Sequence, residues 1–186
     1  MAHQANTPED YDLFPETVVN DGAIPGYGNL WVAELKSFLT IAPEPNTSSV
    51  EGGLRIITGD HTFAATKGFR KMTLYRGDSQ TDGTFPGDPG FKTTLYNVKA
   101  FVVGDDANTR EFCEMLINKG VILLQTAPDC ADTRILQHGC SCSPTVVKDS
   151  KFSSGGRISG GKKGYEITFE STCLFDYQGV VTARTA

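Results

Sequence analysis

One stretch of the sequence decides the fold class: residues 165–173 read Tyr-Glu-Ile-Thr-Phe-Glu-Ser-Thr-Cys. Apolar or small residues stand at the odd positions, and polar residues stand at the even positions. Successive side chains of a strand point to opposite faces of a sheet, so this alternation predicts a strand with one buried and one solvated face. The first face is Tyr165, Ile167, Phe169, Ser171 and Cys173, and the second is Glu166, Thr168, Glu170 and Thr172.

Further strands are predicted on both sides of this stretch. Apolar or alternating runs indicate strands at residues 30–41, 69–76, 91–103, 121–126, 134–138 and 145–152. Residues 54–58 and 61–65 are predicted to form a hairpin around Gly59-Asp60, and residues 180–182 to close the sheet. In the longest run, Tyr96, Val98, Ala100 and Val102 are expected to share one face.

One helix interrupts the strands. Asn108 is suited to cap it, with Glu111 three residues later, and Gly120 is suited to stop it. Between them Phe112, Met115, Leu116 and Lys119 follow helical spacing. Strands, one helix and then strands predict an α+β, mainly β fold: a β-sandwich or partial barrel with one flanking helix.

The remaining segments are rich in glycine and proline, of which the chain has 20 and 9 among its 186 residues. Residues 1–29 are predicted to form an extended N-terminal arm, and residues 30–186 the folded domain. Residues 78–90 and the basic segment 153–164 are predicted to be loops without regular structure. A loop as long as 78–90 in a compact domain is usually functional.

Charge is unevenly distributed along the chain, whose net charge is −5. Residues 1–60 hold nine acidic and two basic residues, and residues 61–186 hold thirteen acidic and fifteen basic residues. Such a chain is a poor binder of nucleic-acid phosphates. It is able to stack with its negative end on a positive end, and the alternative is that the acidic N-terminal segment is only solvated. The sequence has no signal-peptide pattern and no apolar run of 18 residues, so we expect a soluble protein made in a reducing cytoplasm.

Candidate chemistry is sparse. His138, Cys140 and Cys142 bring an imidazole and two thiols together, which are zinc ligands, but Cys-x-Cys is not the usual knuckle spacing. The alternative is that these cysteines are free thiols that behave as small apolar residues. His61 is expected at the surface beside a turn, and no serine lies in a nucleophile elbow. We therefore expect neither an enzyme nor a bound cofactor.

Two parts of the chain are similar to a known group of proteins. The run 159–171, Ser-Gly-Gly-Lys-Lys-Gly-Tyr-Glu-Ile-Thr-Phe-Glu-Ser, is followed by Phe175-Asp-Tyr177-Gln-Gly179. Upstream, Lys67-Gly-Phe-Arg-Lys71 opens a strand, which precedes a long strand, a helix and an apolar strand. Over residues 54–182 the order resembles tail-tube-like virion proteins of phages that infect Bacteroidetes-type bacteria. The 78–90 loop and the Cys140–Cys142 stretch depart from that pattern.

The resemblance implies a β-sandwich with a flanking helix that joins copies of itself into six-fold rings, which stack into a virion tail tube and meet other tail or connector proteins. DNA would pass through the lumen without specific binding, along a polar, net-negative face for which Glu166, Thr168 and Glu170 are the candidates. The arm and the two loops would make contacts between subunits. The candidate residues in these loops are Asp78, Phe85, Phe91, Arg157, Lys162 and Lys163.

Three other functions remain open on the sequence. One is a small metalloprotein or redox enzyme that uses His138, Cys140 and Cys142. A connector, head-completion or tail-terminator ring uses a similar fold. A carbohydrate- or receptor-binding β-sandwich would instead have an aromatic groove near Trp31, Tyr75 or Tyr96.

Overall fold

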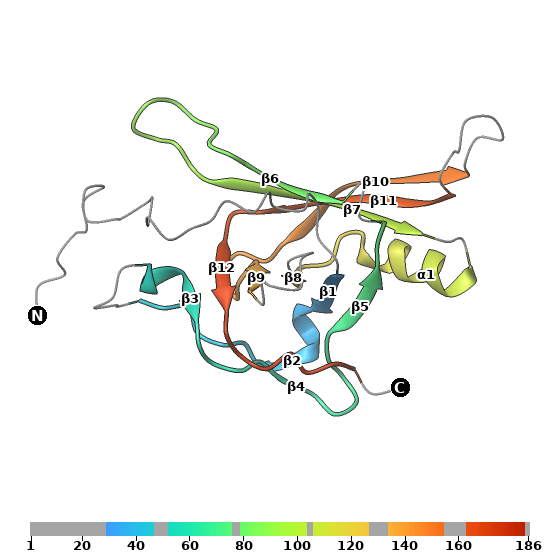
Figure 1. The fold of residues 1–186 in the computed structure, drawn as a ribbon, viewed down its shortest axis with the longest axis horizontal. Helices are drawn as coiled ribbons and strands as arrows, with labels where there is room; N and C mark the ends of the chain where they lie inside the picture. The colour runs from blue at the N-terminus through green and yellow to red at the C-terminus, as the bar shows by residue number, and fades with distance from the viewer. Residues whose placement is uncertain are drawn as a thin grey trace, which may run out of the picture.

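The structure, a computed structural model, describes residues 29–46, 52–75, 79–103, 106–126, 134–154 and 163–184. A six-stranded and a four-stranded sheet pack face to face, with a small two-stranded sheet and an α-helix beside them (Figure 1). This arrangement confirms the predicted class, α+β and mainly β. The predicted arm up to residue 28 and residues 155–162 of the basic loop lie outside the described residues, as do Asp78, Arg157 and Lys162.

The six-stranded sheet has the order β3-β12-β9-β8-β1-β5 and is antiparallel except for the β3-β12 pair. Its strands are β1 (Asn29–Glu34), β3 (Ile56–Ile57), β5 (Arg70–Thr73), β8 (Val121–Thr126), β9 (Ile135–His138) and β12 (Leu174–Tyr177). Residues 121–125 of β8 are all buried. Both faces of this sheet are therefore covered, which explains why the predicted strand at 121–126 is an apolar run without alternation.

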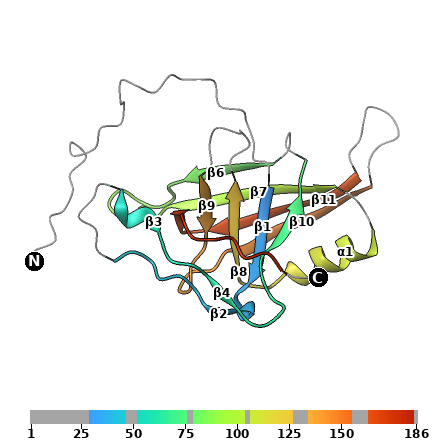
Figure 2. The same cartoon turned by 60° about the horizontal axis from the view of Figure 1, so that its bottom comes forward.

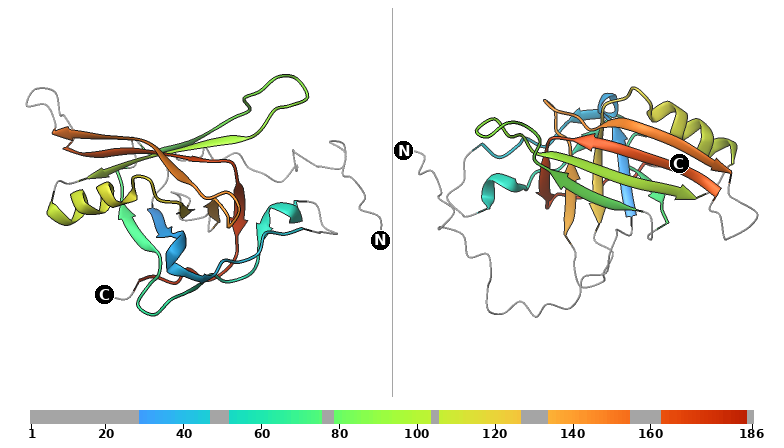
Figure 3. Two further views of the ribbon diagram at one scale, coloured as in Figure 1. Left: turned by 180° about the vertical axis from the view of Figure 1, so that it is seen from behind. Right: turned by 90° about the horizontal axis from the view of Figure 1, so that it is seen from above.

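The four-stranded sheet has the order β10-β11-β7-β6. Its strands are β6 (Gln80–Thr84), β7 (Leu95–Val103), β10 (Val146–Ser154) and β11 (Lys163–Ser171). Tyr165, Ile167 and Phe169 are buried while Glu166 is exposed, so the alternation predicted for this stretch is confirmed. The four strands run crosswise to those of the larger sheet (Figures 2 and 3). Their inner face is covered by the larger sheet, and on the outer face Phe101, which the register places opposite Glu166, is also buried.

Two apolar cores lie on either side of the six-stranded sheet. The first fills the space between the two sheets and includes Val98, Ala100 and Val102 of β7, on the predicted shared face. The second lies on the other face and includes Phe69 and Tyr177. The two-stranded sheet of β2 (Phe38–Thr40) and β4 (Thr62–Phe63) borders this second core.

Helix α1 (Ala107–Leu116) is shorter than predicted. Its N-cap is Asp106, not Asn108, because the Asp106 carboxylate accepts hydrogen bonds from the Thr109 N–H at 2.9 Å and the Thr109 hydroxyl at 2.6 Å. It ends before Gly120, because Asn118 already adopts the left-handed conformation with φ of 65°. The helix buries Cys113 and Leu116, while Met115 stays exposed.

The predicted hairpin at 54–65 is wrong. Residues 53–55 form a 3₁₀ turn, after which β3 pairs with β12 and β4 pairs with β2, so the two strands join different sheets. The Asp60 carboxylate accepts a hydrogen bond from the Val180 N–H at 2.7 Å. The Gly59-Asp60 segment thus holds the C-terminal region, and residues 180–182 form no strand of their own.

Two other predictions need correction. The predicted strand 30–41 is broken by a 3₁₀ turn at Leu35–Ser37, where the Leu35 N–H bonds to the Gly120 carbonyl at 3.0 Å. The predicted loop 78–90 contains strand β6, which pairs with β7 from Gln80 to Thr84. Gly83 of β6 pairs with Tyr96 of β7, and a Cβ on Gly83 would be in van der Waals contact with the Tyr96 ring, at 3.4 Å.

Candidate assembly surface

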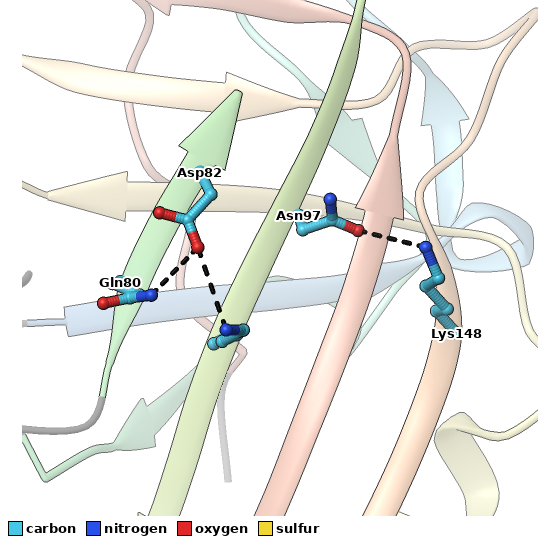
Figure 4. A network of polar contacts seen from close by, with 5 residues as sticks. Gln80, Asp82, Asn97 and Lys148 are labelled. Carbon is cyan, nitrogen blue, oxygen red and sulfur yellow. Dashed lines mark hydrogen bonds and ion pairs between the residues drawn. The ribbon is translucent and has the colours of Figure 1, made fainter. Parts of the chain in front are cut away.

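The outer face of the four-stranded sheet is polar and crossed by ion pairs. Lys148 of β10 lies 2.7 Å from the Glu170 carboxylate of β11, and Lys99 of β7 lies 3.8 Å from the Asp82 carboxylate of β6. Lys148 also donates to Asn97, and Gln80 donates to Asp82 (Figure 4). All four strands therefore contribute polar side chains to this face, on which the register also places Phe101 and Val146.

The three residues predicted to line a lumen lie together on this face. Glu166, Thr168 and Glu170 alternate along β11, an inner strand of the sheet, and point away from the first core. The negative charge of the two glutamates is partly balanced by lysines. The register places Lys151 opposite Glu166 and Lys99 opposite Thr168. The outer face carries four carboxylates and three ammonium groups: Asp82, Asp149, Glu166 and Glu170, and Lys99, Lys148 and Lys151.

Both edges of this sheet are open in the described part of the chain. No strand pairs with the free side of β10, which is nine residues long, or with the free side of β6. Val146 and Phe152 of β10 are 43% and 45% exposed. A long edge with exposed apolar side chains is a template for pairing with another chain. A bulge between Val147 and Asp149 and the lysines of β10 restrict that pairing to a partner that matches them.

The edges of the six-stranded sheet are different. One edge is β3, which has only two residues. The other is β5, with four residues, and beside it Phe69 forms a parallel bridge with Ala183. Edges as short as these offer little for another subunit, so the long open edge in the described residues is that of the four-stranded sheet.

A hairpin extends from this sheet beyond the sandwich (Figure 1). Its turn, residues 85–94, is held by hydrogen bonds from the Phe91 N–H to the Asp88 carbonyl and from the Thr93 N–H to the Pro86 carbonyl. The Phe85 and Phe91 side chains are 66% and 85% exposed. At the other end, Lys163 is also exposed, where β11 begins. The hairpin thus presents two aromatic rings that no part of the described chain covers.

The proposed zinc ligands do not meet. His138 points between the two sheets, where its Nε2 lies 3.0 Å from Gln125 Oε1 and its ring packs edge-on against Tyr96. Cys140 belongs to the second core, on the other face of the six-stranded sheet, and Cys142 is exposed. Within the described ranges, no three His, Cys, Asp or Glu side chains gather in a way that would hold a metal ion.

Burial keeps these groups in their neutral forms. It lowers the pKa of His138 to about 4. Burial raises the pKa of the Cys140 thiol to about 12, helped by the hydrogen bonds that the protonated thiol makes with the accepting Glu44 carboxylate and with Cys173. The Cys140 Sγ lies 3.4 Å from Cys173 Sγ, a pair that the sequence spacing did not indicate. A protonated thiol is a poor nucleophile and a poor metal ligand, so Cys140 acts here as a packing residue.

His61 is buried, with 2% of its surface exposed, and not at the surface as predicted. Its Nδ1 accepts a hydrogen bond from the Ala42 N–H at 3.1 Å, and its Nε2 lies 2.9 Å from Gln137 Oε1. The ring stacks on Tyr177 with centroids 4.8 Å apart. Because Nδ1 accepts, Nε2 carries the proton and donates to Gln137, and burial lowers the pKa of this imidazole. His61 therefore joins segments that are distant in sequence.

The aromatic residues suggested for a carbohydrate groove do not share one surface. Trp31 packs against the second core, whereas the Tyr96 ring meets His138 between the sheets. These two rings lie on opposite faces of the six-stranded sheet. Tyr75 is partly exposed.

Comparison with known proteins gives no relative: no family model, no curated protein and no solved structure matches the chain. Among the helices of the described residues, none has the length and apolar character needed to cross a membrane.

Proposed function

We propose that this protein is a virion structural protein whose copies join into rings, six to a ring, that stack into the tube of a phage tail. The observation that carries the proposal is the pair of open edges on the four-stranded sheet, β10 on one side and β6 on the other. Two different edges that pair head to tail generate a ring when the rotation between subunits closes.

Ring closure would satisfy the main-chain groups of both edges. β10 has nine residues and β6 has five, so β6 limits the shared ladder to about five residues. The bulge and Lys148 of β10 would set the register, and the partner would cover Val146. A continuous sheet around the ring has no edge left to pair with a wrong partner.

The outer face of the same sheet would then line the lumen. Its acidic and basic side chains nearly balance, and Glu170 is held by Lys148 at 2.7 Å. Tight DNA binding requires clustered lysines and arginines that release counterions from phosphates. A nearly neutral polar face instead lets DNA pass without being held. The lumen that we propose is therefore nearly neutral, and not net-negative as the resemblance implied.

The projecting hairpin would contact a neighbouring subunit or ring. Phe85 and Phe91 are too exposed to contribute to the stability of a single chain. Burying two phenylalanine side chains contributes about 3–6 kcal/mol, which is a large share of an interface between stacked rings. The folded turn reduces the entropy lost when these rings become ordered on contact.

Hydrogen exchange combined with sedimentation tests this function. The purified protein should sediment as rings or stacks, and the amides on the free sides of β10 and β6 should exchange more slowly in the assembled fraction than in the dissociated one. Amides of β8 serve as the control, since they are paired on both sides in either state. Assembly without added protection at β10 or β6 would refute ring closure through these edges.

A further inference from the structure

A cavity of about 350 Å³ lies between helix α1, the end of β1 and the chain segments at 67–70 and 184. Its apolar lining comes from Val32 of β1 and from Phe112, Met115 and Leu116 of the helix. Met115 is 58% exposed. The cavity is thus a surface groove with an apolar floor, and we call it the α1 groove.

The rim of the α1 groove is basic. Lys67, Arg70 and Arg184 line it and are exposed, and within the described residues no carboxylate forms an ion pair with any of them. Arg70 is placed over the Phe112 ring at 4.6 Å. The lining acids are Glu34, which pairs with Lys119 at 2.9 Å, and Glu111. Four bases against two acids leave the groove with an excess of positive charge.

The basic rim is held in place by the fold. The Phe69 N–H bonds to the Thr182 carbonyl at 2.9 Å, and the Arg184 N–H bonds to the Phe69 carbonyl at 3.0 Å. Gly68 lies so close to this segment that a Cβ would be 2.6 Å from the Arg184 nitrogen. Lys67, Arg70 and Arg184 are therefore brought together before any ligand arrives, which lowers the cost of binding one.

One segment of the chain has the complementary composition. Residues 1–28 contain five acidic residues and no lysine or arginine: Glu9, Asp10, Asp12, Glu16 and Asp21. Apolar residues, Tyr11, Leu13 and Phe14, lie among these acids. An acidic segment with interspersed apolar side chains matches a groove with an apolar floor and a basic rim.

We propose that the α1 groove binds the acidic leader, residues 1–28, of a second copy of this chain. Leu13 and Phe14 would pack on Phe112 and Met115, and Asp12 and Glu16 would pair with the basic rim. The leader joins β1 at Asn29, whereas the groove is at the other end of that strand, at Glu34. This distance, about 17 Å, is within reach of a 28-residue segment, so the choice of a second copy follows from the proposed assembly and not from distance. This inference rests on the proposed function, for which it supplies a contact between subunits.

Charge reversal in the full-length chain tests the proposal. The leader variant is Asp12→Lys with Glu16→Lys, and the groove variant is Lys67→Glu with Arg184→Glu. Arg70 is left unchanged because it packs on Phe112. The control is Arg55→Glu with Lys71→Glu, which makes the same charge change at exposed residues outside the groove. Each leader or groove variant should assemble at least tenfold more weakly than the wild type in sedimentation velocity, while the control should not.

Combining the variants separates binding by a second copy from binding within one chain. An equal mixture of leader and groove variants should recover assembly, because each leader meets a complementary groove on the other chain. Recovery when all four changes are in one chain, but none in the mixture, would overturn the assignment to a second copy. If both variants assemble like the wild type, the result contradicts the groove proposal and leaves the ring proposal intact. If the wild-type protein is monomeric, the result contradicts both proposals.

Photochemical crosslinking tests the same contact without the charge-reversal variants, so its result does not depend on whether those variants fold. A benzoylphenylalanine in place of Phe14, in an otherwise wild-type chain, should crosslink to residues 107–119. In a mixture of ¹⁴N- and ¹⁵N-labelled protein, mass spectrometry should find this crosslink between chains of different isotope. Crosslinks only within one chain, or only to other regions, would contradict the proposal.

Discussion

The Lys148 ammonium lies 2.7 Å from the Glu170 carboxylate and ties the edge strand β10 to β11 on the open face of the four-stranded sheet. As an exposed pair it contributes at most about 1 kcal/mol to stability. Its larger effect is on charge, because it neutralises one of the three residues that we place in the lumen. The proposed passage of DNA depends on this balance.

Changing that balance should make the assembled protein bind DNA. Glu166→Lys places an ammonium beside Lys151 and repeats it in every subunit of the ring. We expect at least tenfold tighter binding of double-stranded DNA to assembled protein at low salt, lost as salt rises. A mobility-shift titration measures this. Glu114→Lys, on the exposed surface of α1, is the matched control and should not bind. Equal binding by both variants would contradict the placement of β11 in the lumen.

The buried imidazole of His138 should make stability depend on pH. Its pKa is about 4 in the folded chain, against an ordinary value of 6.5 when unfolded. The unfolded chain therefore binds more protons between these values, and stability falls as pH drops from 6.5 towards 4. The full loss below pH 4 is about 3 kcal/mol, and His61, with a pKa shifted in the same direction, adds to it. Urea unfolding at pH 7 and 4.5 measures the change.

His138→Gln tests the assignment of this pH dependence. The variant removes the titrating group and keeps a side chain able to donate a hydrogen bond to Gln125. Its stability should vary less between pH 7 and 4.5 than that of the wild type. An unchanged slope would show that other groups cause the dependence.

Substitutions at two phenylalanines should have different effects, one on the stability of the single chain and the other on assembly. Phe169 is fully buried between the sheets, so Phe169→Ala should cost about 3–5 kcal/mol of unfolding free energy. Phe91 is 85% exposed, so Phe91→Ser should leave the unfolding free energy of the single chain within about 0.5 kcal/mol. The same variant should reduce assembly in sedimentation. If Phe91→Ser assembles as the wild type does, the hairpin takes no part in subunit contacts.

The neighbouring thiols of Cys140 and Cys173 should form a disulfide with a mild oxidant. Diamide would accept the two electrons and two protons that the thiols lose, and the new bond would close a loop between positions 33 residues apart. Such a crosslink stabilises by about 3–4 kcal/mol. The reaction should be slow at pH 7 and faster at pH 9, because the high pKa of Cys140 keeps its thiolate rare. Thiol titration and thermal unfolding follow it, with Cys173→Ser as the control.

Local patterns predicted the parts of the fold that local physics determines. The alternation in β11 and the apolar run of β8 identified both strands, because burial on one or two faces is visible in the order of residues. The shared face of Val98, Ala100 and Val102 follows for the same reason. The sequence also placed Phe85 in a loop, whereas Phe91, predicted to begin a strand, lies in the turn before β7.

The errors came where distant segments decide the structure. β3 pairs with β12, which follows it by more than a hundred residues, so nothing near Ile56 indicated that partner. β6 contains glycine and is a strand because β7 pairs with it and because Thr81 bonds to Gln125 across the sandwich. His61 is buried by Gln137 and Tyr177 for the same reason. The basic rim of the α1 groove likewise combines residues 67–70 with Arg184, which only the folded chain brings together.

Electron microscopy of the purified full-length protein tests the central claim most directly. The account predicts rings of six subunits, alone or stacked into tubes, with the β10 edge of each subunit against the β6 edge of the next and the Glu166 face towards the central channel. Single rings without tubes would favour a connector or terminator. A particle that stays a single chain at high concentration, with both edges free, would contradict the account.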